Sequence, residues 1–231
     1  MARQRRTRHD SAIAVVGLGR FGTALAVELA QHGAEVLGVD ASEDVVQHLH
    51  GTLSHVVQGD STDPAVIEQL GLGEYARVVV AIGSDVTASI LTTSQLLRAG
   101  VGELWAKAIS PQHAVILEQL GVHHVVSPEA DMGRRVAHMV RGSSDDFLEV
   151  DGAYGAMVVR VPRRLAGVPL RELAIQKEHG VVVVAVRQGE ALRNANAETR
   201  LSPDGSMLVA GPTLEVEAFA ARVATMRAED G

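Results

Sequence analysis

The chain has 231 residues, of which 46% are hydrophobic, and it contains no cysteine. This length suffices for one large domain or two small ones, and the lack of cysteine excludes disulfides and thiolate metal sites. The formal net charge of −7 argues against a nucleic-acid-binding groove, so no nucleic-acid partner is expected.

Basic charge is concentrated at the N-terminus, where four of the first nine residues are arginine. For residues 1–11 we predict a solvated, disordered basic tail, with contact to anionic lipid or phosphate as the alternative. No apolar segment follows these charges, so a signal peptide is not expected. The longest apolar run, 181–186, is much shorter than the about 18–20 residues of a membrane span. We therefore expect no membrane span in this chain.

Residues 12–142 predict a repeated strand–helix unit. The predicted strands are runs of Val, Ile and Ala at 12–16, 35–39, 55–58, 77–82, 103–108 and 124–127. The predicted helices alternate with them at 21–32, 42–51, 62–71, 85–98, 110–121 and 128–141. Continuously apolar strands are typical of parallel sheets covered on both faces. The sequence therefore predicts an α/β domain with a Rossmann-like, doubly wound parallel sheet.

Polar residues at 142–146 predict a linker, after which the rhythm changes. Strands are predicted at 147–150, 157–161, 181–187 and 207–211, with helices at 170–174 and 213–226. This pattern predicts a smaller C-terminal α+β domain at 147–227. It contains a single histidine, His179, and no grouping of histidine, lysine and carboxylate that would suit acid–base catalysis.

The most informative motif lies between the first predicted strand and helix. Gly17, Gly19 and Gly22 have the spacing G-x-G-x-x-G, in which the glycines allow a tight turn, close approach of a pyrophosphate, and close packing of helix on strand. The helix N-terminus then presents N–H groups to an anion. Asp40 ends the second predicted strand, 23 residues after Gly17, where a carboxylate can bind ribose hydroxyls. A glycine turn without a ligand is the alternative.

Six motifs in register resemble the RCK family, the regulators of potassium conductance, and most of all the cytosolic gating subunits of Ktr/Trk-type bacterial potassium uptake systems. The resemblance covers residues 12 to about 225. The motifs are Gly17-Leu-Gly-Arg-Phe-Gly22, Val39-Asp40, Gly59-Asp-Ser-Thr-Asp63, Val80-Ala-Ile-Gly83, Leu104-Trp-Ala-Lys-Ala108 and Pro128-Glu-Ala-Asp-Met-Gly133.

The resemblance implies a nucleotide site formed by Gly17, Gly19, Arg20, Phe21, Gly22, Asp40, Asp60, Ser61, Ile82, Gly83 and Lys107. Arg20 can reach phosphate, and its alternative is an exposed arginine at a helix start. Asp60 is implied to lie beside the adenine, with a turn or cap role as the alternative. Lys107 is an isolated charge in an apolar strand, which can meet phosphate or pair with a structural carboxylate.

The resemblance also implies a cation site at Glu129, where Mg²⁺ or another cation is shared with the nucleotide phosphates. A first-turn acid that favours the helix dipole is the alternative. In the second domain, several relatives bind cyclic di-AMP through an arginine and an asparagine. Gln176 and Val182 stand at those places here, which leaves cyclic di-AMP binding doubtful.

The function implied by the resemblance is that of a non-enzymatic subunit, cytoplasmic and peripheral to the inner face of the membrane. It would form dimers that assemble into an octameric ring under a membrane potassium channel subunit, with ATP favouring conduction and ADP closure. NAD(H) is also possible as ligand, because Asp40 suits any ribose with a free 2′-hydroxyl. Two alternatives stay open: an NAD-dependent oxidoreductase with a C-terminal substrate cap, and an RCK-type sensor of another cation transporter.

Overall fold

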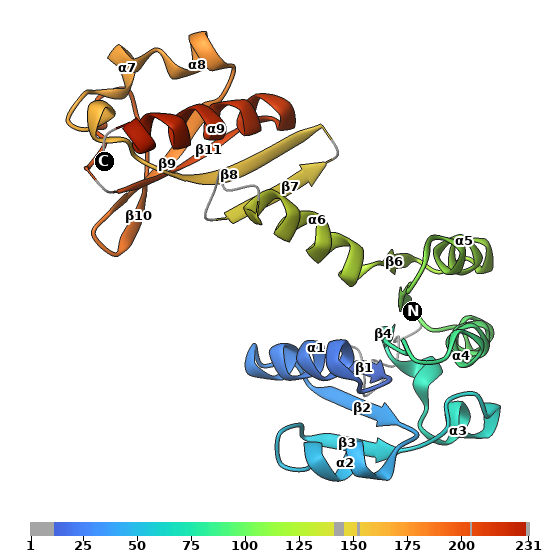
Figure 1. The fold of residues 1–231 in the computed structure, drawn as a ribbon. Helices are drawn as coiled ribbons and strands as arrows, with labels where there is room; N and C mark the ends of the chain where they lie inside the picture. Colours follow the sequence, from blue (N-terminus) through green and yellow to red (C-terminus); the bar gives the residue numbers. More distant parts are fainter. Residues whose placement is uncertain (1–11, 141–145, 152, 204, 230–231) are drawn as a thin grey trace, which may run out of the picture. The chain divides into compact units, whose positions relative to one another are not determined.

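The structure is a computed structural model that describes residues 12–140, 146–151, 153–203 and 205–229. The predicted basic tail and most of the predicted linker lie outside these residues. The chain divides into a first compact unit that ends at Glu129 and a second that begins at Ala130, and each is described by itself (Figure 1). Within the described residues, no helix is both long and apolar enough to cross a membrane.

The first unit alternates strands and helices along the chain. Its strands are β1 (Ile13–Val16), β2 (Val36–Asp40), β3 (His55–Gln58), β4 (Arg77–Val80), β5 (Glu103–Lys107) and β6 (His124–Val126). Its helices are α1 (Arg20–Gln31), α2 (Glu43–Leu49), α3 (Pro64–Gln69), the short η1 (Leu72–Glu74), α4 (Val86–Ala99) and α5 (Pro111–Leu120). Helix α6 (Pro128–Val140) begins in this unit and continues into the second.

The six strands form one parallel sheet in the order β3-β2-β1-β4-β5-β6. The chain runs outward from β1 to β3 and then crosses back to β4, so the order reverses between β1 and β4. Ligands of doubly wound sheets bind at such a reversal, outside the carboxyl ends of the strands. The predicted doubly wound parallel sheet is confirmed.

Both faces of this sheet are buried, as the apolar strands predicted. In β1, Ala14 and Val16 pack with α3, α4 and α5, while Ile13 and Val15 pack with α1 and α2. Helices α3, α4 and α5 begin at capping side chains, which are those of Asp63, Asp85 and Ser110. Asp85 accepts a hydrogen bond of 3.0 Å from the Ala88 N–H at the start of α4.

The second unit contains an antiparallel sheet in the order β10-β9-β11-β8-β7. Its strands are β7 (Asp146–Asp151), β8 (Tyr154–Arg160), β9 (Val182–Gln188), β10 (Ala191–Asn194) and β11 (Ser206–Pro212). Its further helices are η2 (Arg163–Leu165), α7 (Leu170–Leu173), α8 (Ile175–His179) and α9 (Thr213–Glu229). This confirms a smaller C-terminal domain of mixed helix and sheet.

Helix α9 lies against β8 and β11 and covers one face of the antiparallel sheet (Figure 1). Its buried Phe219 and Val223 share a core with Met157 and Val209. Residues of the other face are apolar but exposed, among them Leu148 on β7.

Three described elements of this unit were not predicted, namely the short η2, helix α8 and strand β10. Strand β10 is exposed along its whole length, so it lacks the apolar alternation that reveals a strand. Helix α8 follows α7 directly because Ala174 between them has a left-handed φ of 47°. An alanine in the sequence gives no signal for this conformation.

Candidate nucleotide site

The glycine loop joins β1 to α1 in a conformation that requires two of its three glycines. Gly17 has a φ of 91°, and a Cβ there would lie 2.9 Å from the Ile82 backbone nitrogen. A Cβ on Gly22 would lie only 1.9 Å from the Gly17 carbonyl oxygen. Nothing lies within 4 Å of the Cβ position of Gly19, and the N-terminus of α1 has no side-chain cap. The loop is therefore tightly packed at Gly17 and Gly22 and open at Gly19.

Asp40, at the end of β2, is hydrogen-bonded to this loop. Its Oδ2 accepts a hydrogen bond of 2.6 Å from the Leu18 N–H, and its Oδ1 accepts one of 2.9 Å from the Ser42 N–H. A carboxylate offers about four acceptor positions, so both oxygens keep capacity for a further donor. The side chain thus stands in a fixed orientation beside the glycine loop.

The loop after β3 presents Asp60 and buries Ser61. Asp60 Oδ1 accepts hydrogen bonds from the Thr62 hydroxyl (2.7 Å) and the Thr62 N–H (2.9 Å), and these bonds lower the pKa of its carboxyl. Asp60 therefore has the turn role that the sequence left open as the alternative to contact with adenine. The Ser61 side chain is buried and shares a hydrogen bond of 2.8 Å with the Thr92 hydroxyl on α4, so this hydroxyl points into the protein.

Beyond β4, the chain approaches the glycine loop and the amine of Lys107. Ile82 contacts Gly17, as described above. A Cβ on Gly83 would lie 3.1 Å from Lys107 Nζ, so the absence of a side chain leaves room for the ammonium. Ile82 and Gly83 therefore connect the glycine loop to the end of β5.

Lys107, the last residue of β5, is only 7% exposed. Its Nζ donates a hydrogen bond of 2.6 Å to Glu129 Oε1 at the start of α6 and lies 5.6 Å from the centre of the Phe21 ring. The Glu129 side chain is 68% exposed. Its pKa is lowered, first by this hydrogen bond and also by the charge of Arg20, which is itself exposed.

The predicted site residues thus form three groups at one edge of the sheet, where the carboxyl ends of parallel strands meet. Gly17, Gly19, Gly22 and Ile82 form the loop, with Asp40 beside it; Phe21, Gly83, Lys107 and Glu129 cluster at the ends of β4 and β5; Asp60 and Ser61 follow β3. The helix N-terminus and the cations Arg20 and Lys107 make this edge suitable for an anion.

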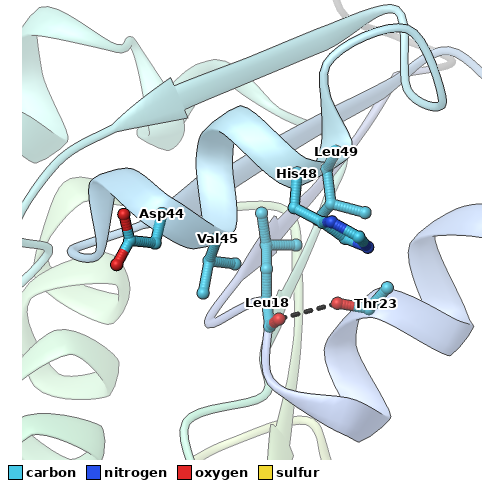
Figure 2. Close-up of a pocket in the computed structure, with 6 residues that line it drawn as sticks. All are labelled: Leu18, Thr23, Asp44, Val45, His48 and Leu49. Atoms are coloured by element: carbon cyan, nitrogen blue, oxygen red, sulfur yellow. Dashed lines mark hydrogen bonds between the residues drawn. The ribbon is translucent and has the colours of Figure 1, made fainter.

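Sequence reasoning missed a pocket of about 330 Å³ between α1 and α2 (Figure 2). It is lined by Leu18, Thr23, Asp44, Val45, His48 and Leu49. Thr23 donates a hydrogen bond of 2.6 Å to the Leu18 carbonyl, which ties the pocket to the glycine loop. The only sequence signal is that Thr23 directly follows the last glycine of the motif.

Comparison with known proteins gives matches over both units. Residues 13–128 match the TrkA-N domain family and residues 156–224 the TrkA-C domain family. The chain is 37% identical to the Ktr system potassium uptake protein C of Bacillus subtilis (strain 168), over 91% of this chain and 96% of that protein. It is also 37% identical to the Ktr system potassium uptake protein A of Vibrio alginolyticus, over 88% of this chain and 93% of that protein.

Among solved structures, one of the GsuK channel bound to NAD matches 96% of this chain with a TM-score of 0.65 at 17% identity. The match covers 44% of that channel chain, so this chain spans less than half of its length. At this identity the likeness shows a shared fold.

Proposed function

The chain belongs to the RCK family, and within it to the Ktr-type potassium uptake proteins. From this membership we propose that it is a cytosolic regulatory subunit. It senses an adenine nucleotide and thereby gates a separate membrane potassium channel. Potassium uptake is named for both relatives at 37% identity. The observation that carries nucleotide sensing is the open glycine at the start of α1, beside a carboxylate hydrogen-bonded to the same loop.

The phosphate end of the ligand belongs at the N-terminus of α1. Gly19 leaves the backbone accessible there, and the first turn of the helix carries partial positive charge without a side-chain cap. Arg20 extends from the same turn into solvent and can add a charged fork of donors. We therefore assign Gly19 and Arg20 to phosphate, with Arg20 nearest the terminal phosphate.

The ribose end belongs at Asp40. Its carboxylate is oriented by the Leu18 and Ser42 N–H groups and can accept hydrogen bonds from ribose hydroxyls. A 2′-phosphate would be repelled by this charge, so ATP, ADP and NAD(H) suit the site and NADP does not. We expect ATP to favour conduction and ADP to favour closure.

The residues present also fit a cation held together with phosphate. Among the described residues there is no group of three histidine, cysteine or carboxylate side chains that could enclose a metal ion. Glu129 instead offers one exposed carboxylate. Mg²⁺ is usually bound by one or two carboxylates together with water and substrate phosphates. We propose that Glu129 supplies that carboxylate and that the cation neutralises phosphate charge.

A membrane partner and self-assembly complete the proposal. We propose that a separate membrane channel subunit supplies the potassium pathway. The apolar outer face of the second sheet, with Leu148, Val182 and Val184 exposed, supports a homodimer through this unit. We propose that such dimers form an octameric ring at the inner face of the membrane. Gln176 and Val182 argue against cyclic di-AMP as a ligand of this unit.

The second unit favours regulation over catalysis. His179, the histidine of residues 147–227, has a side chain that is only 18% exposed and packs against Phe219, with ring centres 5.2 Å apart. A dehydrogenase needs an accessible acid–base group beside the nicotinamide. We therefore propose that the protein is not an enzyme.

Calorimetric titration of the purified chain with ATP, ADP, NADH and cyclic di-AMP tests this proposal, with particle size measured in each state. We expect saturable binding of an adenine nucleotide and no binding of cyclic di-AMP. Incubation with NADH and candidate electron acceptors should leave NADH unconsumed. Steady NADH oxidation would replace the proposal with an oxidoreductase.

A further inference from the structure

Two charged side chains of the candidate site are bound to each other. Lys107 was expected to meet phosphate or a structural carboxylate, and Glu129 to meet a cation or the dipole of α6. The structure joins them through a hydrogen bond of 2.6 Å between Nζ and Oε1. While this ion pair exists, the ammonium occupies Oε1, and its positive charge repels a metal cation from the carboxylate.

We propose that Lys107 is an internal counter-ion that holds Glu129 until a nucleotide phosphate binds the ammonium, so that cation binding at Glu129 depends on bound nucleotide. This inference rests on the proposed nucleotide site. It adds to that site an order of binding, in which phosphate replaces Glu129 at Lys107 before the cation binds Glu129. It makes Lys107 a positioning residue for Glu129.

The ammonium of Lys107 cannot remain without an anion. Lys107 is 7% exposed, its Nζ lies beside the Gly83 backbone, and the Phe21 ring lies 5.6 Å away. A buried charge without a partner is costly, and an aromatic face compensates it only in part. Glu129 therefore stays bound until another anion reaches the same ammonium.

The two partners of the ion pair differ in their access to solvent. The Glu129 side chain is 68% exposed, so it can turn into water with little loss of solvation. The Lys107 side chain is enclosed and cannot follow it. The pair therefore opens by movement of Glu129, while the ammonium remains in place.

A phosphate bound at the proposed site can reach the ammonium of Lys107. Phe21 is the second residue of α1, whose N-terminus is the proposed phosphate site, and its ring already lies beside Lys107 Nζ. Phosphate at this N-terminus would thus come close to the ammonium and compete with Glu129 for it. A released carboxylate with full negative charge is a better ligand for a hard cation than one shared with an ammonium.

Terbium luminescence offers a direct test, because Tb³⁺ substitutes for hard cations and is sensitised by a nearby tryptophan. The chain has one tryptophan, Trp105, which lies on β5 two residues before Lys107, about 7 Å along the strand and on the same face. Tb³⁺ affinity is measured without nucleotide in wild type and in Lys107→Met. Methionine preserves the apolar stem, and it leaves behind a carboxylate that is largely exposed to water, so the fold should persist.

We expect Lys107→Met to bind Tb³⁺ more tightly than wild type by roughly fivefold, the upper end of the range for an ion pair whose carboxylate is exposed to solvent. Lys107→Arg should bind like wild type because the positive charge remains. Lys177→Met is the matched control, since it removes an exposed lysine of α8 and the same unit of charge. Lys107→Gln repeats the test if the methionine variant fails to fold.

The gain must also require Glu129. In the double variant Lys107→Met/Glu129→Gln, the increase in Tb³⁺ affinity should disappear. The inference is overturned if Lys107→Met binds Tb³⁺ no better than wild type, or if the gain survives in the double variant. Titration of wild type with ATP distinguishes failure of this inference from failure of the proposed function. If ATP binds but Lys107→Met gains no Tb³⁺ affinity, only this inference is refuted. If no nucleotide binds, the proposed function is refuted.

Discussion

Substitution of Asp40 by alanine should lower both the stability of the protein and its affinity for adenine nucleotides. The change removes two acceptors, those for the Leu18 and Ser42 N–H groups, at 2.6 and 2.9 Å. Hydrogen bonds to a charged group contribute about 1.5–3 kcal/mol, so we expect the free energy of unfolding to fall by about that amount. Loss of a comparable contact to ribose should weaken ATP, ADP and NADH alike, by about 10–150-fold.

The assay is calorimetry at a temperature where circular dichroism shows the variant folded. Asp44→Ala is the matched control, because Asp44 is an exposed acid in the first turn of α2 and is not one of the residues assigned to the nucleotide. This control should retain nucleotide affinity within about twofold, as expected for a single screened surface charge. Wild-type affinity in a folded Asp40→Ala would refute the ribose assignment.

Four further predictions concern the loop and the ion pair. Arg20→Ala should weaken ATP more than ADP in calorimetry; an equal loss would move its contact to the inner phosphates. Gly22→Ala should lose about 3 kcal/mol or more of unfolding free energy, because its Cβ would overlap the Gly17 carbonyl, whereas Gly19→Ala should stay folded and lose nucleotide; equal stability of the two would contradict the loop geometry. In Glu129→Gln, Mg²⁺ should no longer tighten ATP binding, whereas it should do so in wild type; equal tightening in both would leave Glu129 as a first-turn acid. Because the pKa of Glu129 is lowered, the stabilisation by its ion pair is present above the ordinary glutamate pKa and is lost as pH falls through the lowered value. The difference in unfolding temperature between wild type and Glu129→Gln should therefore be constant above about pH 5 and shrink below about pH 4; a difference that does not change with pH would contradict the pair.

Much of the first unit could be predicted because its signals are local. Runs of Val, Ile and Ala between glycines indicate strands buried on both faces. The glycine motif predicts a loop conformation in which a side chain at Gly17 or Gly22 would clash with neighbouring atoms. The predicted family resemblance is confirmed by the matches over both domains. The nucleotide and cation roles of the individual residues stay predictions.

What could not be predicted depends on contacts between distant parts of the chain. From the sequence, the partner of Lys107 could be either phosphate or a carboxylate. The fold brings Glu129, 22 residues later in the chain, within 2.6 Å of the Lys107 amine. The bond between Asp40 and the Leu18 N–H likewise spans 22 residues. The exposed strand β10 had no apolar pattern, because it needs only its hydrogen bonds to β9.

Potassium flux is the measurement that tests the central claim most directly. Proteoliposomes would contain a Ktr-type membrane subunit with this protein added on the side that corresponds to the cytoplasm. The account predicts that ATP with Mg²⁺ increases potassium flux above the level seen with ADP, and that Asp40→Ala abolishes this difference. Flux that is the same with ATP, with ADP and without nucleotide would contradict it.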